Sequence, residues 1–145
     1  AESGYTYKSM GTGEHLPCHA YQTLGIFYRL VPDSWFVSLL AGTRGNLDKS
    51  LNWMEQANTC SPGRIGILKE LAISLQCIGT SRKDEDSLVR ADGILKSALQ
   101  MPATTDTEVI DLKHIPKLIA DPKLACGYSR DGQQERDEKE MKKGK

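Results

Sequence analysis

One segment of the chain, residues 62–78, is apolar around most of a helical circumference. It opens with Ser61-Pro62, a cap residue followed by a proline suited to the first helical position. Its only charged residues are Arg64, Lys69 and Glu70. A surface helix keeps a broad polar face, so a helix of this kind belongs inside an assembly of other helices. The sequence therefore predicts a helical stack built around residues 62–78.

Apolar residues also recur at helical spacing on both sides of this segment. We expect helices over residues 17–30, 35–43, 47–57, 62–78 and 87–101, and short helices over 107–112, 114–120 and 122–128. Pro116 and Pro122 are expected to interrupt the last part, and residues 80–86 to form a loop. No segment alternates with period two for long enough to predict a strand. The predicted fold class is all-α.

Small residues and turn residues recur at regular spacing between residues 37 and 102. One unit carries Ser38, Gly45, Ser50, Met54, Ala57 and Pro62, and the next carries Ala72, Gly79, Ala91, Leu95, Ala98 and Pro102. This arrangement resembles tetratricopeptide-type helical repeats, with an insertion in the second unit. The resemblance implies antiparallel helical hairpins in a right-handed stack, where small residues let neighbouring helices approach closely. The alternative is a generic helical bundle.

The resemblance also implies a binding groove, because the first helix of each hairpin in that family lines a concave surface that holds peptide segments. The corresponding positions here are Trp35, Leu39, Lys69, Ile73 and Gln76. This groove is largely apolar, which favours an amphipathic helix or apolar segment as its occupant. We therefore expect a protein–protein interaction module, an adaptor or scaffold subunit of a larger assembly. Core packing of Trp35 and Ile73 is the competing interpretation.

Charge divides the chain unevenly. Residues 1–80 hold 12 charged side chains and residues 81–145 hold 26, although the net charge is zero. We expect an extended arm over 1–13, a helical domain over 14–128, and a solvated or frayed charged tail over 129–145. The sparsely charged first half predicts that a protein partner or a second copy covers part of it. Zero net charge argues against nucleic-acid binding, and no apolar run is long enough to span a membrane.

The four cysteines, Cys18, Cys60, Cys77 and Cys126, are separated by gaps of 42, 17 and 49 residues. An even number permits a secreted disulfide framework, but the density is low for a small stapled scaffold. We therefore expect reduced cysteines and an intracellular, cytoplasmic location. The alternative is a secreted or virion-associated helical bundle, stabilised by disulfides, that acts as a ligand or structural protein.

Recognisable catalytic motifs are missing, so we expect no enzymatic activity, no catalytic residue and no cofactor. His15, Cys18 and His19 are residue types that bind metals, and they lie close together in the sequence. A closed zinc site needs a fourth ligand, and none is evident nearby. We therefore expect no metal site.

Overall fold

The computed structural model describes residues 16–30 and 46–144 of the chain. Its elements are α1 (Leu16–Leu30), α3 (Leu47–Cys60), α4 (Ile65–Arg82), α5 (Glu85–Leu99), α6 (Asp106–Ala120), the 3₁₀ helix η1 (Pro122–Leu124) and α7 (Arg130–Lys143). These residues contain no strand, which confirms the all-α prediction. The arm expected over 1–13 and the helix expected over 35–43 lie outside the described residues.

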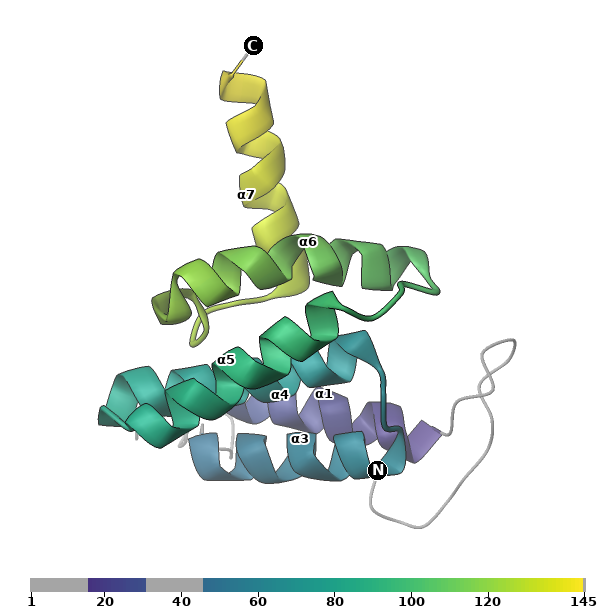
Figure 1. Ribbon diagram of the computed structural model, residues 1–145, viewed down its shortest axis with the longest axis vertical. Helices are drawn as coiled ribbons and strands as arrows, with labels where there is room; N and C mark the ends of the chain where they lie inside the picture. Colours follow the sequence, from purple (N-terminus) through teal and green to yellow (C-terminus); the bar gives the residue numbers. More distant parts are fainter. Residues whose placement is uncertain (1–15, 31–45, 145) are drawn as a thin grey trace, which may run out of the picture.

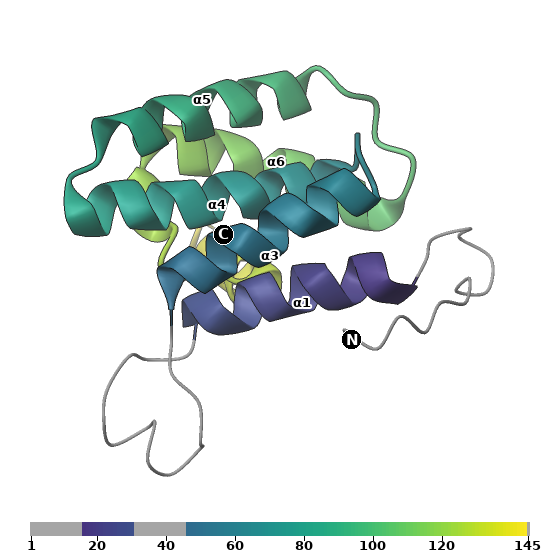
Figure 2. The ribbon, with the colours of Figure 1, turned by 90° about the horizontal axis from the view of Figure 1, so that it is seen from below.

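Helix α4 lies at the centre of the structure, as its apolar circumference predicts. It packs against α1, α3, α5, α6 and η1. Figure 2 shows α1, α3, α4 and α5 side by side in this order, and Figure 1 shows α6 crossing the same body on another side. Thirteen of the 18 residues of α4 are buried. The helix therefore provides a common surface on which the other helices pack.

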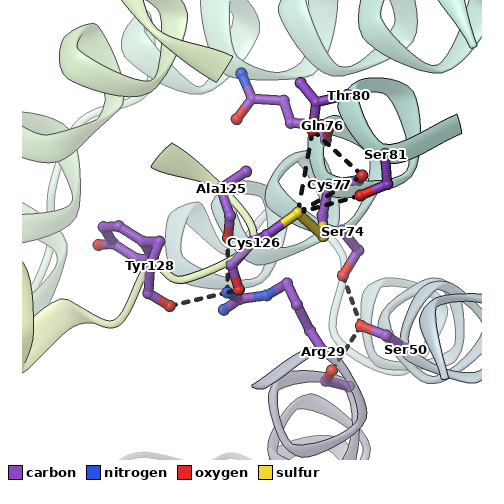
Figure 3. Close-up of a disulfide and its surroundings, with 11 residues drawn as sticks. Arg29, Ser50, Ser74, Gln76, Cys77, Thr80, Ser81, Ala125, Cys126 and Tyr128 are labelled. Atoms are coloured by element: carbon purple, nitrogen blue, oxygen red, sulfur yellow. Dashed lines mark hydrogen bonds between the residues drawn. A yellow bond between two sulfur atoms is a disulfide. The ribbon is translucent and has the colours of Figure 1, made fainter. Parts of the chain in front are cut away.

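Small residues occupy the close helix contacts that the repeat spacing predicts. Ser50, Ala57, Ala72, Ala91 and Ala98 are all fully buried. The Ser50 hydroxyl lies 2.6 Å from the Gly25 carbonyl oxygen of α1, to which it donates, and 2.9 Å from the Ser74 hydroxyl of α4. These buried hydroxyl contacts join α1, α3 and α4, and Figure 3 shows the contact between Ser50 and Ser74. Ser50 thus lies at a close contact between helices, and the four alanines are buried as that prediction requires.

The link between α4 and α5 is shorter than predicted. The expected loop over 80–86 is wrong, because α4 continues to Arg82 and α5 starts at Glu85. Lys83 ends α4 in the left-handed conformation, with a φ of 55°. Asp84 then caps α5 by accepting hydrogen bonds from the Ser87 backbone and hydroxyl. Gly79, the residue after the predicted helix over 62–78, lies inside α4 and does not end it.

Further boundaries differ from the prediction. Ser61 and Pro62 do not open the central helix, because Ser61 ends α3 and α4 begins at Ile65 after Arg64. Residues 106–120 form one helix that passes through Pro116, instead of two short ones. Proline removes one backbone hydrogen bond, but Ile115 and Leu118 beside it are fully buried, so tertiary packing supports the helix. The helix expected over 122–128 is limited to the three residues of η1.

The cysteines form two disulfides, Cys18–Cys60 and Cys77–Cys126. The first joins α1 to the end of α3, and the second joins α4 to the segment after η1 (Figure 3). The Cα atoms lie 5.5 and 4.8 Å apart, within the usual range for a disulfide. The expectation of reduced cysteines in the cytoplasm is therefore wrong. Paired cysteines point to an oxidising, extracellular environment.

The charged C-terminal region forms helix α7, which projects away from the body (Figure 1). Its base is attached to α6, whereas residues 138–144 are all exposed. No helix in the described part of the chain is long and apolar enough to cross a membrane.

Two helical glycines are expected to respond oppositely to substitution by alanine. A Cβ atom on Gly79 would lie 2.5 Å from Leu88 Cγ and 3.0 Å from the Asp84 carbonyl oxygen, so α4 and α5 would have to separate. We expect Gly79→Ala to lower the free energy of unfolding by about 1–3 kcal/mol. A Cβ on Gly93 meets nothing within 4 Å, so Gly93→Ala should raise it by about 0.5–1 kcal/mol.

Urea unfolding followed by circular dichroism measures both changes. Stabilisation by Gly79→Ala would contradict the close packing of α4 against α5.

Candidate functional site

A network of buried charges forms around two adjacent residues of α4, Lys69 and Glu70. Lys69 Nζ donates to Asp111 Oδ1 of α6 at 2.6 Å, and it lies 3.7 Å from Glu70 Oε1. Glu70 Oε2 accepts a hydrogen bond from Arg29 Nη2 of α1 at 3.1 Å. Arg130, the first residue of α7, donates from Nε and Nη2 to the two oxygens of Asp111 at 2.9 and 3.2 Å. Four of these side chains are at most 5% exposed, those of Arg29, Lys69, Glu70 and Asp111. The side chain of Arg130 is 32% exposed.

The network holds one more positive charge than negative charge. Its cations are Arg29, Lys69 and Arg130, and its carboxylates are Glu70 and Asp111. Arginine stays protonated in proteins, so the burial that lowers the Arg29 pKa does not remove its charge. Buried charges are normally balanced by partners, because an uncompensated charge away from water is costly. The excess charge is therefore a distinctive property of this site.

Arg29 also ties α1 to the segment that follows η1. Its Nη1 donates to the carbonyl oxygens of Ala125 at 2.8 Å and Tyr128 at 2.9 Å (Figure 3). Cys126, between them, carries the second disulfide. The disulfide and the guanidinium together hold the turn that leads into α7.

Tyr128 and His114 extend the network towards α7. The Tyr128 hydroxyl accepts from Lys69 Nζ at 2.8 Å and lies 2.7 Å from His114 Nδ1. Burial and the nearby carboxylates raise the pKa of Tyr128, so its hydroxyl keeps its proton. On the other side of the ring, His114 Nε2 faces the Asp137 carboxylate at 3.7 Å.

A partly open cavity of about 290 Å³ lies beside the exposed member of the network, Arg130. Residues from α1, α4, α6 and the start of α7 line it, including Gln22, Gly66, Thr107 and Asp111. A Cβ atom on Gly66 would lie 3.0 Å from Asp111 Oδ2 and 3.6 Å from Arg130 Nη2. Absence of a side chain at residue 66 therefore leaves space in front of this ion pair.

A second cavity, of about 620 Å³, forms the groove between α6 and α7. Its lining includes Ile110, Lys113, His114, Lys117, Asp137 and Met141. Lys117 of α6 forms an ion pair with Asp137 of α7, which sets the position of the projecting helix above the groove.

Three of the five predicted partner-binding residues lie on α4, and all three are internal. Lys69 belongs to the ion network, Ile73 is in the hydrophobic core, and Gln76 donates to the Leu118 carbonyl oxygen at 2.9 Å. Their side chains pack inside the helical body instead of lining an open groove. Trp35 and Leu39 lie outside the described residues.

The described residues contain no group of three or more side chains arranged to hold a metal ion. Cys18 is paired with Cys60, so its sulfur is not a free ligand. His15 lies outside the described residues, and His19 lines the 290 Å³ cavity.

Loss of the Asp111 charge is expected to lower the free energy of unfolding more than loss of the Lys69 charge. Asp111→Asn would leave three cations with the single carboxylate of Glu70, and we expect it to lower the free energy of unfolding by about 3–5 kcal/mol. Lys69→Met leaves two cations and two carboxylates, so its cost should be smaller. Lys96→Met, in an exposed ion pair with Asp92, is the matched control and should change stability by less than about 0.5 kcal/mol.

Urea unfolding of the three variants gives this order directly. A larger loss for Lys69→Met than for Asp111→Asn would contradict the excess positive charge.

Stability is expected to fall as the pH falls below neutral because of His114. Burial and the charge of Lys69 lower its pKa from the ordinary 6.5 despite the opposing charges of Asp137 and Asp111. The folded state then binds fewer protons than the unfolded state, so the free energy of unfolding falls as the pH falls from 6.5 towards the lower folded value. His114→Gln should flatten this dependence, as followed by thermal unfolding between about pH 7.5 and 5.

Val89→Gln on α5, at an exposed position that carries no titratable group, should keep the wild-type dependence. A wild-type profile in His114→Gln would refute the role of the buried imidazole.

A scan of protein-family models and searches of curated proteins and solved structures find no match to this chain. The tetratricopeptide resemblance stays a prediction, and the geometry of the described residues carries the functional inference.

Proposed function

We propose that this chain is an extracellular, disulfide-stabilised helical protein that acts as a ligand for a protein partner. The observation that carries the proposal is the pair of disulfides, Cys18–Cys60 and Cys77–Cys126. They support the extracellular setting over that of an intracellular adaptor. The internal positions of Lys69, Ile73 and Gln76 also favour this function over capture of a segment in an α4 groove.

The disulfides stabilise the body that presents the binding surface. They close loops of 42 and 49 residues, each contributing about 4 kcal/mol in the chain-entropy description. One links α1 with α3, and the other fixes the turn before α7 to the central helix. The projecting helix thus rises from a covalently fixed base.

The second half of α7 is the surface that we assign to the partner. Residues 138–144 are exposed, and Met141 is an apolar side chain, 63% exposed, among charged neighbours. An isolated helix of this length is marginal in water, so a partner that packs along it would add the missing tertiary contacts. The adjoining α6–α7 groove, with Ile110 and Met141 in its lining, provides further apolar area.

Photo-crosslinking from α7 tests the proposal. The oxidised protein, checked to have no titratable thiol when denatured, carries a photoreactive amino acid in place of Met141 and is applied to intact cells of its source. We expect one defined surface protein to be crosslinked, and excess unmodified chain to suppress the product, because Met141 lies in the proposed contact.

The matched control places the same photoreactive residue at Val89 of α5, which is 71% exposed. It should give no such product. Lys139→Glu with Lys142→Glu on α7 should lower the yield, whereas Lys96→Glu on α5 should not. Equal crosslinking from both helices, or none from α7, would refute the assignment.

A further inference from the structure

The ion network and the cavity beside it point to a binding site that is separate from the proposed α7 surface. The network has an excess of one positive charge, and Arg130 is its only member with a substantially exposed side chain. Two neighbouring sets of charges are balanced in sign, and Asp131, the next residue of α7, is exposed. Glu108 and Arg64 at the cavity carry opposite charges, as do Lys117 and Asp137 at the base of α7. The buried network among the described residues therefore keeps one excess positive charge, and it reaches the cavity at Arg130.

The hydrogen-bonding capacity of the cavity favours an acceptor. Arg130 uses Nε and one Nη2 hydrogen on Asp111, and its Nη1 has no hydrogen-bond partner among the described residues. The edge formed by Nη1 and Nη2, which makes no hydrogen bond to residues 16–30 or 46–144 beyond that to Asp111, matches the two oxygens of a carboxylate. Gln22, whose amide nitrogen would lie 3.8 Å from a Cβ on Gly66, provides a second donor from α1.

The carboxylates at the cavity are already engaged, which argues against a cationic ligand. Asp111 accepts from Lys69 and Arg130. Glu108 accepts from the Thr104 backbone and hydroxyl through Oε1 and from the Ile65 backbone through Oε2. A cation would therefore add to the excess positive charge and compete with these bonds.

The size of the cavity sets the size of the ligand. Its volume of about 290 Å³ exceeds the roughly 150 Å³ that holds a benzene molecule and lies at the lower end of small-molecule pockets. Ile67 is an apolar residue among those that line the cavity. The cavity thus suits a carboxylate attached to a small apolar body.

We propose that the cavity between Gly66 and Arg130 binds a small organic carboxylate, whose charge balances the buried ion network. The carboxylate lies against the free edge of Arg130, and the apolar part lies along the start of α4. The site does not include the α7 surface. A result that disproves carboxylate binding therefore leaves the proposed function unaffected.

Benzoate and benzamide provide the test, because they share a ring and differ in charge. Titration of the full, oxidised chain at low salt, followed by amide chemical shifts, should show saturable benzoate binding with the largest shifts at residues 64–67 and 130. Benzamide should bind at least about tenfold more weakly, because it cannot compensate the excess charge. Equal affinity for the two, or benzoate shifts centred elsewhere, would overturn the proposal.

Two variants separate the site from general effects. Gly66→Ala places a methyl group 3.0 Å from Asp111 Oδ2 in the cavity and should weaken benzoate binding at least about tenfold, whereas Gly93→Ala on α5 should leave it unchanged. Lys69→Met removes the excess positive charge of the network. It should therefore reduce the difference in affinity between benzoate and benzamide. Wild-type benzoate affinity in Gly66→Ala, or an undiminished difference in Lys69→Met, would count against the site.

Discussion

Two opposite charges on the central helix determine much of the structure. Lys69 and Glu70 lie on α4, which the rest of the protein covers, so both side chains need partners that are also removed from water. Arg29 of α1 and Asp111 of α6 provide these partners, and Arg130 fixes the start of α7 to Asp111. Apolar packing brings the helices together, and these directional contacts specify how α1, α6 and α7 are placed around α4.

One part of this arrangement can be predicted from the sequence, and the other part cannot. The apolar circumference of residues 62–78 predicts a central helix, and the adjacent charges within it indicate that buried ion partners are needed. The partners of Glu70 and Lys69 lie 41 and 42 residues away, in α1 and α6. No local periodicity relates positions at such distances, so Asp111 and Arg130 cannot be identified as site residues before the helices are assembled.

The errors at the helix ends and the cysteines have related physical causes. Gly79 suggests a helix end when only backbone preference is considered, but its missing side chain admits Leu88 of α5. Wide gaps between the cysteines suggest unpaired thiols only when sequence separation is used as the measure of distance between them. Antiparallel packing of α1 on α3 brings Cys18 next to Cys60 across 42 residues. In both cases, a contact between helices decides a feature that local sequence leaves open.

The uneven charge of the network distinguishes it from a purely structural device. Apolar residues of similar volume often replace buried ion pairs without loss of stability, so fold stability alone gives no reason for three cations around two carboxylates. A balanced network would be complete within the protein. The present one directs its surplus through Arg130 to a cavity that a side chain on residue 66 would narrow. The same residues that attach α7 to the body thus leave a charged, partly open cavity at its base, which links the architecture of the fold to a capacity for binding.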